Sequence, residues 1–235
     1  MRLSILIPVY NEEKTILAVL ERIKKVDLGL AKEIIIVNDG SKDNSEEIIR
    51  SFLKKNKSSK GTSWKFYSKE NGGKGSAIKM ALSHATGDLS IIQDADLEYL
   101  PEEIETLIAE YNKRKSEVVY GSRILKRDNK ASYILYYLGN VFLSFMTSIL
   151  YGRVITDMET CYKLIPTKIF RELKITRNNF DLEPEITAKI LRKGYNIKEI
   201  PITYNPRSKT EGKKISWRDG FSALWVLFKI RISRA

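Results

Sequence analysis

The chain of 235 residues carries 41 Lys and Arg against 29 Asp and Glu, which gives a formal net charge of +12. Its one cysteine excludes an intramolecular disulfide, and one cysteine with one histidine cannot build a His/Cys zinc site. A Ser-His-Asp hydrolase is not expected either, because His84 lies in a helix-like segment with no nucleophile elbow. Length and composition are typical of a soluble globular protein with a sizeable core, in a cytosolic or cytosol-facing setting.

The first half of the chain alternates short apolar runs with segments of helical periodicity. Apolar residues recur at helical spacing in 16–23, 48–52, 78–82 and 102–111. The runs between them predict strands at 3–9, 33–37, 64–67, 89–94 and 118–120. Repeated strand–helix units of this kind predict an α/β fold whose mostly parallel sheet is covered by helices on both faces.

Polar residues follow these strands at the points where the strands end. In open α/β sheets, ligands bind outside the carboxyl ends of the strands, so we expect these side chains to converge on one edge. The residues in question are Tyr10, Asn11, Glu12, Asp39, Lys74, Asp94 and Asp96.

The most acidic of these strand ends is the stretch 91–99. Its carboxylates, Asp94, Asp96 and Glu98, share one face if the chain stays extended past the strand. Neighbouring carboxylates repel unless a cation lies between them, and their hard oxygens suit Mg²⁺ or Mn²⁺ with phosphate oxygens completing the coordination. The other reading is an acidic turn that caps a helix beginning near Pro101.

The second half of the chain holds the whole charge excess. Residues 1–120 carry 19 basic and 19 acidic side chains, whereas residues 121–235 carry 22 and 10. Such a basic half predicts a polyanionic partner, which is a set of phosphates, a nucleic acid or an anionic membrane surface. No recognition-helix or ribonucleoprotein signature supports the nucleic-acid reading, so no nucleic-acid partner is expected.

Two segments of this half have the character of membrane-facing, amphipathic helices. Residues 131–152 are uncharged and long enough to span a bilayer, but polar residues recur along them every three or four positions. This stripe favours a helix with one side in the protein and the other on a membrane surface, and a true span stays open. Residues 217–232 combine aromatic and basic side chains, which suits either a membrane interface or a helix docked on the core. The polar stripe is Asn140, Ser144, Thr147 or Ser148, and Tyr151.

Taken together, the polar clusters form an ordered set of motifs. In this order they resemble the family 2 glycosyltransferases of GT-A fold, and within them the dolichyl-phosphate and polyprenyl-phosphate hexose synthases. The motifs are Pro8-Val9-Tyr10-Asn11-Glu12-Glu13, Asn38-Asp39-Gly40-Ser41, Asn71-Gly72-Gly73-Lys74-Gly75, Asp94-Ala95-Asp96, Gly121-Ser122-Arg123, Thr156-Asp157-Met158-Glu159, and Arg207 with Glu211-Gly212-Lys213.

The resemblance implies an inverting transferase that moves mannose or glucose from GDP-mannose or UDP-glucose to dolichyl or polyprenyl phosphate. It further implies one domain over 1–235, with a donor-binding half at 1–123 and an acceptor- and membrane-facing half at 124–235. The protein would be peripherally associated with the cytoplasmic face of a membrane.

Site roles carried over by the resemblance fall into three groups. Asp94 and Asp96 would hold Mg²⁺ or Mn²⁺ on the donor diphosphate, and Arg123 would face the reacting phosphates. Arg207 and Lys213 would bind the donor diphosphate or the acceptor phosphate. The remaining donor-binding positions are Pro8, Tyr10, Glu12, Asp39, which would read the base or ribose, Lys74, and Ala95 through its backbone.

The chemistry of the acceptor decides how Asp157 and Glu159 are read. A lipid phosphate is already ionised and needs cations more than a general base, so the basic second half favours it. Asp157 and Glu159 occupy the place where many inverting relatives keep a base, and here we interpret them as positioning groups or pocket wall. The rival reading is transfer to a sugar or glycolipid hydroxyl, with Asp157 or Glu159 as base.

Overall fold

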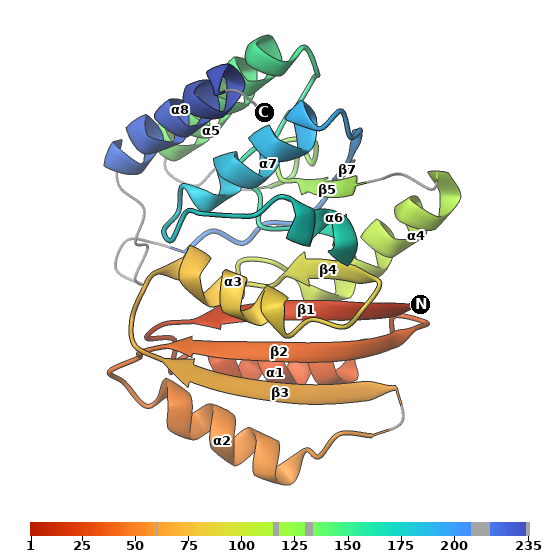
Figure 1. Ribbon diagram of the computed structural model, residues 1–235. Coiled ribbons are helices and arrows are strands. Elements are labelled where there is room, and N and C mark those ends of the chain that lie inside the picture. Colours follow the sequence, from red (N-terminus) through yellow and green to blue (C-terminus); the bar gives the residue numbers. More distant parts are fainter. Residues whose placement is uncertain (60, 115–117, 130–133, 208–216, 234–235) are drawn as a thin grey trace.

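One mixed sheet of seven strands runs through the described part of the protein (Figure 1). The computed structural model describes residues 1–235 except 60, 115–117, 130–133, 208–216 and 234–235. The strands are β1 (Arg2–Val9), β2 (Ala31–Asp39), β3 (Thr62–Lys69), β4 (Leu89–Ile92), β5 (Val118–Ser122), β6 (Lys163–Pro166) and β7 (Ile197–Pro201). Their order is β3-β2-β1-β4-β6-β5-β7. Only β6 is antiparallel to its neighbours, so the expected mostly parallel sheet is confirmed for the described residues.

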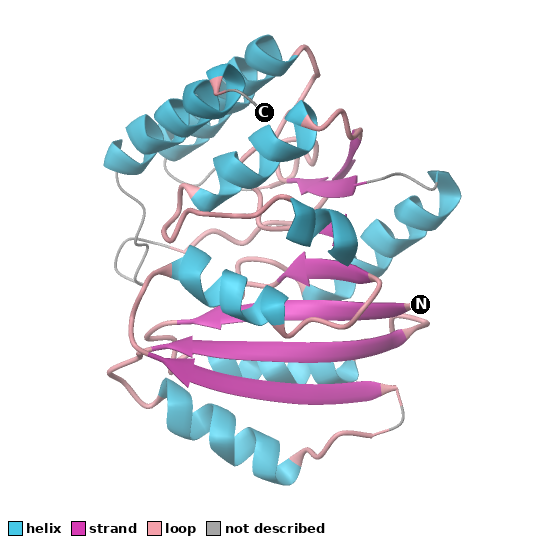
Figure 2. Ribbon diagram, viewed as in Figure 1, coloured by secondary structure: helices cyan, strands magenta, loops and turns pink. Residues whose placement is uncertain are grey.

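Helices cover both faces of this sheet, as Figure 2 shows. They are α1 (Ile16–Lys25), α2 (Ser45–Lys55), α3 (Lys74–Ser83), the 3₁₀ turn η1 (Pro101–Glu103), α4 (Ile104–Arg114), α5 (Ile134–Tyr151), α6 (Thr167–Glu172), α7 (Leu182–Arg192) and α8 (Trp217–Ile232). One core lies between the sheet and α1, α2 and α4, and a second lies between the sheet and α3, α6 and α7. A smaller third core joins α5 and α8 to α7.

The apolar strand sequences follow from this layering. Side chains alternate between the faces of a strand, so Ile5 and Ile7 of β1 join the first core and Leu6 joins the second. Because both faces are covered, both sets are apolar and the strand reads as a continuous run. All three side chains are at most 1% exposed.

The acidic stretch after β4 does not continue the strand, although the sequence predicted a strand over 89–94. The strand ends at Ile92 rather than at residue 94. Leu97 has a φ of 63°, and the amide of Glu98 donates to Oδ1 of Asp96 at 3.1 Å. The chain therefore turns here, because a left-handed residue and an Asx-type hydrogen bond break the strand geometry. The turn still directs all three carboxylates to one place, as described below.

The segment 131–152 forms α5 over its described part, and its polar stripe points inward. Asn140, Ser144 and Thr147 are at most 9% exposed, whereas Phe142 and Phe145 are more than half exposed. The predicted division of this helix into a protein-facing and an outward side is thus confirmed. No helix within the described ranges has the length and apolar character needed to cross a membrane.

Two further differences concern helix boundaries. α6 was not expected, since it has only six residues and begins directly after β6. The spacing of Ile186, Ile190 and Leu191 predicts a helix that begins at Pro184. In the structure α7 begins at Leu182, so the proline lies in its first turn, where a missing N–H has no helical partner to lose.

Candidate active site

A cavity of about 310 Å³ opens at the carboxyl ends of β1, β2 and β4. The loops after these strands form one wall, and the segments around residues 159, 180 and 204 form the other. Of the residues proposed from the sequence, the lining includes Pro8, Tyr10, Glu12, Asp39, Lys74, Asp94, Ala95, Asp96, Arg123, Glu159 and Arg207. Asp157 is not part of the lining, and Lys213 lies outside the described residues.

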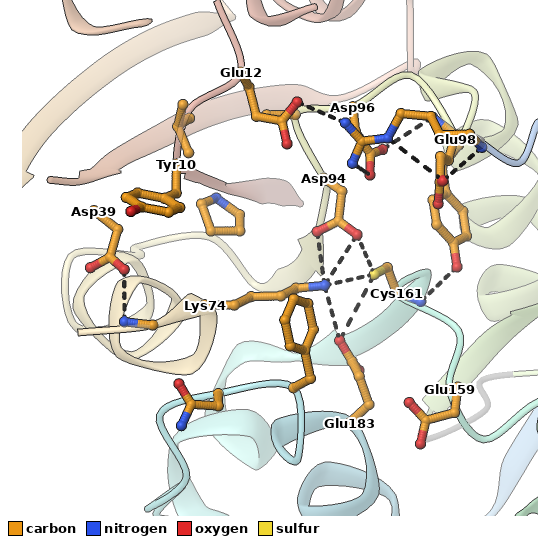
Figure 3. A pocket seen from close by; sticks show the side chains of 18 of the residues that line it. Tyr10, Glu12, Asp39, Lys74, Asp94, Asp96, Glu98, Glu159, Cys161 and Glu183 are labelled. Atoms are coloured by element: carbon orange, nitrogen blue, oxygen red, sulfur yellow. Dashed lines mark hydrogen bonds and ion pairs between the residues drawn. The ribbon is translucent and has the colours of Figure 1, made fainter. Parts of the chain in front are cut away.

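Asp39 shapes the turn that forms one side of the cavity. Its carboxylate accepts hydrogen bonds from the amides of Gly72 (3.0 Å) and Gly73 (2.7 Å) and pairs with the ammonium of Lys69 at 2.6 Å. The side chain is only 2% exposed. It therefore fixes the start of α3, and with it the position of Lys74. Figure 3 shows the ring of Tyr10 beside Asp39.

Lys74 reaches across the cavity to a buried cluster of two carboxylates and a thiol (Figure 3). Its Nζ lies 2.9 Å from Oδ1 of Asp94, 2.9 Å from Sγ of Cys161 and 3.5 Å from Oε1 of Glu183. Burial works against the charge of Lys74, but Asp94, Cys161 and Glu183 outweigh it and hold the pKa of Lys74 well above its usual value. The lysine stays charged and serves as the counter-ion of Asp94.

The cysteine of this cluster acts as a hydrogen-bond donor. Sγ of Cys161 lies 2.6 Å from Oδ2 of Asp94. Burial and the charge of Asp94 hold the pKa of Cys161 well above its usual value, so the group remains a thiol. Burial alone would raise the pKa of Asp94, but Lys74 and this thiol lower it. Asp94 is therefore an ionised carboxylate with defined partners.

Arg207 holds the other carboxylates of the cavity together. Its guanidinium lies 2.9 Å from Oε2 of Glu12, 2.7 Å from Oδ2 of Asp96 and 3.6 Å from Oε1 of Glu98. Glu98 also accepts the amide of Arg207 at 2.9 Å and the hydroxyl of Tyr204 at 2.8 Å. Glu98 thus fixes the chain just before residues 208–216, and Arg207 connects three loops.

Negative charge is in excess in this cavity. Seven carboxylates of the described residues line it, against the three cations Lys74, Arg123 and Arg207. Two of the seven, Asp39 and Glu183, pair with Lys69 and Lys163 outside the lining, which still leaves five carboxylates for the three cations. Burial, together with the charges of Asp94 and Glu98, raises the pKa of Asp96 to about 7, although Arg207 opposes this shift. The site is therefore short of positive charge. The seven are Glu12, Asp39, Asp94, Asp96, Glu98, Glu159 and Glu183.

Asp157 positions Arg123 from behind the cavity wall. Its carboxylate accepts the backbone amide (2.8 Å), Nε (2.8 Å) and Nη2 (2.7 Å) of Arg123, and also Nδ2 of Asn140 at 2.8 Å. Asp157 has no exposed surface. The guanidinium of Arg123 also lies over the ring of Tyr204, 5.0 Å from its centroid. Three of these four hydrogen bonds fix the orientation of Arg123.

Glu159 differs from Asp157, although both come from the same motif. Its side chain lines the cavity (Figure 3), and among the described residues its carboxylate makes no hydrogen bond or ion pair within contact distance. Burial raises the pKa of Glu159 to about 7, although Lys163 acts in the other direction. A carboxylate of this kind can accept a proton near neutral pH.

Several residues that line the cavity were not predicted from the sequence. Cys161 lies two positions after Glu159, the last residue of the motif Thr156-Asp157-Met158-Glu159, and this closeness was the available signal. Glu183 lies in the first turn of α7. The available signal for it was Lys163 of β6, because a fully buried lysine needs a carboxylate partner, and Glu183 lies 2.5 Å from it. Tyr204, Asn179 and Phe180 gave no comparable signal.

The loop that carries Asn179 and Phe180 reaches the cavity through a close backbone contact. Gly73 has a φ of 92°, and a Cβ at this position would overlap the carbonyl oxygen of Asn178. The amide of Gly75 donates to this same oxygen at 2.7 Å. Only glycine permits both the backbone conformation and the approach.

The residues present fit a divalent cation that also binds a diphosphate. Within the residues that the structure describes, no three His, Cys, Asp or Glu side chains form a ready-made metal site. Mg²⁺ and Mn²⁺, however, are commonly held by one or two carboxylates with substrate phosphates supplying further oxygens. Asp94 and Asp96 offer two such carboxylates in a cavity with excess negative charge.

The chain is similar to several known proteins. The model of the family described as "Glycosyl transferase family 2" matches residues 4–174. The chain is 28% identical over 250 residues to a dolichyl-phosphate beta-glucosyltransferase of Trichomonas vaginalis, covering 98% of this chain and 73% of that protein. It is 30% identical over 218 residues to a dolichol-phosphate mannosyltransferase of Pyrococcus furiosus, covering 91% of this chain but only 59% of that protein.

Solved structures show the same fold at lower identity. Glucosyl-3-phosphoglycerate synthase from Mycobacterium tuberculosis, in complex with Mn²⁺, uridine diphosphate and phosphoglyceric acid, superposes with a TM-score of 0.71 at 16% identity. That match covers 100% of this chain and 80% of the other. TarS of S. aureus, in complex with UDP-GlcNAc, gives a TM-score of 0.64 at 18% identity, covering 98% and 66%. The GT-A fold expected from the sequence is thereby confirmed.

Proposed function

Since the chain belongs to glycosyl transferase family 2, we propose that it moves a hexose, mannose or glucose, from GDP-mannose or UDP-glucose to the phosphate of a dolichyl or polyprenyl lipid, with inversion at the sugar carbon. One observation carries this proposal. The cavity joins the carboxylate pair Asp94 and Asp96 to the cations Arg123 and Arg207. The names of the two relatives, a dolichyl-phosphate glucosyltransferase and a dolichol-phosphate mannosyltransferase, support the same acceptor.

The donor would bind along the carboxyl ends of β1, β2 and β4. Pro8, Tyr10 and Asp39 would hold the base and ribose, and the backbone of Ala95 would lie against the nucleotide. Asp94 and Asp96 would hold Mg²⁺ or Mn²⁺, which when bound supplies positive charge to the leaving diphosphate. Lys74 would supply a second cation on the donor side of the cavity, and Glu12 would hold Arg207 in place.

The acceptor would be a phosphate that is already ionised. Arg123 and Arg207 both line the cavity, and both carry positive charge that an incoming phosphate needs in order to approach an anionic donor. Asp157 fixes Arg123 with three hydrogen bonds, so the cation is already oriented before the acceptor binds. Lys213, which lies outside the described residues, stays a predicted phosphate ligand.

We place this reaction on the cytoplasmic face of a membrane, where the protein would be peripherally bound. A polyprenyl phosphate resides in the membrane with its phosphate at the surface, so the enzyme must work at that surface. The absence of any spanning helix among the described residues is compatible with peripheral binding.

The proposal is tested by an assay with labelled GDP-mannose and UDP-glucose, a short-chain polyprenyl phosphate, and Mg²⁺ or Mn²⁺. We expect labelled lipid product from at least one donor. Asp96→Ala should lower the rate by about two to three powers of ten, because it removes charge stabilisation of the leaving group. Glu105→Ala removes an exposed carboxylate of α4 outside the cavity and serves as the control. Lack of lipid product from both donors, or full activity of Asp96→Ala, would rule the proposal out.

A second candidate function, transfer to a sugar or glycolipid hydroxyl, is favoured by one observation. Glu159 lines the cavity without a hydrogen bond or ion pair of its carboxylate to any described residue, and its pKa of about 7 suits a general base. Glu159→Gln separates the two functions. It should lower the rate by about two to four powers of ten if a hydroxyl must be deprotonated, and less than tenfold if the acceptor is a phosphate. Asp157 cannot serve in this test, because its loss also releases Arg123.

A further inference from the structure

Large hydrophobic side chains gather on the outer sides of α5 and α8. Among the described residues, fourteen large hydrophobic side chains are exposed, and ten of these lie on the two helices. On α5 they recur in a stripe of three- and four-residue steps, and on α8 they follow the same spacing. We call these residues the outer face: Tyr137, Leu138, Val141, Phe142, Phe145 and Ile149 of α5, and Phe221, Trp225, Phe228 and Ile232 of α8.

The polarity of α5 is the reverse of that of a helix on a water-exposed surface. Its buried side carries the polar residues, and each has a hydrogen-bond partner in the protein. Asn140 donates to Asp157 at 2.8 Å, Ser144 accepts the amide of Met158 at 2.9 Å, and Thr147 donates to the carbonyl of Leu143 at 2.7 Å. Its exposed side is apolar, with Phe145 at 58% and Ile149 at 60% exposure. A contiguous apolar surface of this kind is typical of an interaction site.

The two helices form one unit at the edge of the molecule farthest from β3. Figure 1 shows α5 and α8 together above α7, and the buried residues Leu143, Ala223 and Leu227 pack there in a common core with α7. The hydroxyl of Tyr151 on α5 donates to the carbonyl of Leu227 on α8 at 2.9 Å. The outer face is therefore built on a fixed support.

Charge distinguishes between the possible occupants of the outer face. Arg153, Lys229 and Arg231 are exposed at its margins, and the sequence of α5 contains no acidic residue. Two copies of the protein that met through this face would bring identical positive charges together. An anionic lipid surface instead complements these cations and accepts the aromatic side chains at the level of the headgroups.

We propose that the outer face of α5 and α8 docks on a bilayer that contains anionic lipids, with both helices lying along the membrane surface. This proposal deepens the proposed function, on which it rests for the identity of the acceptor. The docked helices connect directly to the cavity. Asn140 of α5 holds Asp157, which holds Arg123, and α8 follows Arg207 after residues 208–216.

The experiment is co-sedimentation of the full-length protein with vesicles of phosphatidylcholine, alone or in equimolar mixture with phosphatidylglycerol. The wild-type protein should bind the mixed vesicles and bind phosphatidylcholine alone more weakly. Phe145→Glu combined with Trp225→Glu should lower binding at least roughly tenfold, because it places charge where apolar side chains would enter the interface. Arg153→Gln combined with Lys229→Gln should lower binding to the mixed vesicles by roughly fivefold per charge and reduce its salt dependence.

Leu17→Glu is the matched control, because Leu17 is 48% exposed on α1, away from the outer face. It should bind as the wild type does. The proposal is overturned if the wild type stays in the supernatant with mixed vesicles, or if the double Glu variant binds equally well. It is also overturned if light scattering shows a dimer that this variant dissolves while vesicle binding is absent.

Transfer to a short-chain, water-soluble polyprenyl phosphate without vesicles separates this proposal from the proposed function. The outer-face variants should keep wild-type activity in that assay, because none of the changed residues lines the cavity. Vesicle binding without transfer to any polyprenyl phosphate would remove the proposed function and leave the docking surface intact. Transfer without vesicle binding would remove the docking surface alone.

Discussion

At the scale of single residues, Asp157 and Glu159 show how two acids from one motif acquire different roles. Asp157 accepts hydrogen bonds from Arg123 and Asn140, and these partners, with the charge of Arg123, outweigh burial and lower its pKa. Glu159 lies two positions further on and faces the cavity, where burial raises its pKa to about 7. Neighbouring partners, and not residue type, decide which acid can take up a proton near neutral pH.

Glu159 should therefore make stability depend on pH. Its pKa is about 7 in the folded protein against an ordinary value of 4.5, so the folded state binds the proton more tightly. The stability that this proton provides is complete below pH 4.5 and is lost as the pH rises through 7. Glu159→Gln should thus be more stable than the wild type at pH 8, by on the order of 1 to 3 kcal/mol, with little difference at pH 4.

Urea unfolding at the two pH values measures this difference. Glu105→Gln, which removes the same charge from an exposed position of α4, should change stability by less than about 0.5 kcal/mol at either pH. An equal effect of Glu159→Gln at pH 4 and pH 8 would contradict the raised pKa.

At the scale of secondary-structure elements, the sequence predicted the strands and helices whose apolar residues recur with a regular period. The strands and helices of the first half were found near their expected bounds, because β1, β2 and α1 bury regular apolar patterns. Since parallel strands end at one edge, the convergence of Tyr10, Asp39 and Asp94 was also predictable. The turn at Leu97 and the contact of Cys161 with Lys74 were not, because they depend on long-range packing that leaves no period in the sequence.

The inward polar stripe of α5 leads to the prediction that a more apolar residue in this stripe makes the fold less stable. Asn140→Leu makes α5 more apolar, yet it should destabilise the fold by about 1 to 3 kcal/mol, because Asp157 loses a buried hydrogen-bond donor. Urea unfolding gives the free energy. Phe142→Leu, on the exposed side of the same helix, should change stability by less than about 0.5 kcal/mol. A variant Asn140→Leu that is as stable as the wild type would show that the stripe is not structural.

At the scale of the whole molecule, charge is divided between two regions with opposite signs. The net charge of the chain is +12, but the cavity contains seven carboxylates against three cations. The excess positive charge outside the cavity suits anionic partners at the surface. The cavity itself would repel a nucleoside diphosphate that arrives without a cation. Donor binding should therefore depend on a divalent cation.

Thermal unfolding with ligands tests this coupling without any turnover. UDP or GDP alone should shift the melting temperature little, because the carboxylates of the cavity repel the diphosphate. Mn²⁺ alone should also shift it little, because two carboxylates leave its coordination incomplete without phosphate oxygens. Added together near a hundred times their dissociation constant, they should stabilise the fold by about 2.7 kcal/mol. For a chain of this size such a gain corresponds to a rise of roughly 5 to 10 °C.

The variant Asp96→Asn should abolish the joint effect, because it removes a carboxylate that would hold the cation. Glu172→Gln, at an exposed position of α6, should retain it in full. If Mn²⁺ alone stabilised the protein as much as Mn²⁺ with nucleotide, the carboxylates would form a metal site independent of the donor. A joint effect that persisted in Asp96→Asn would instead mean that the excess negative charge of the cavity, and not this carboxylate pair, makes nucleotide binding depend on the cation.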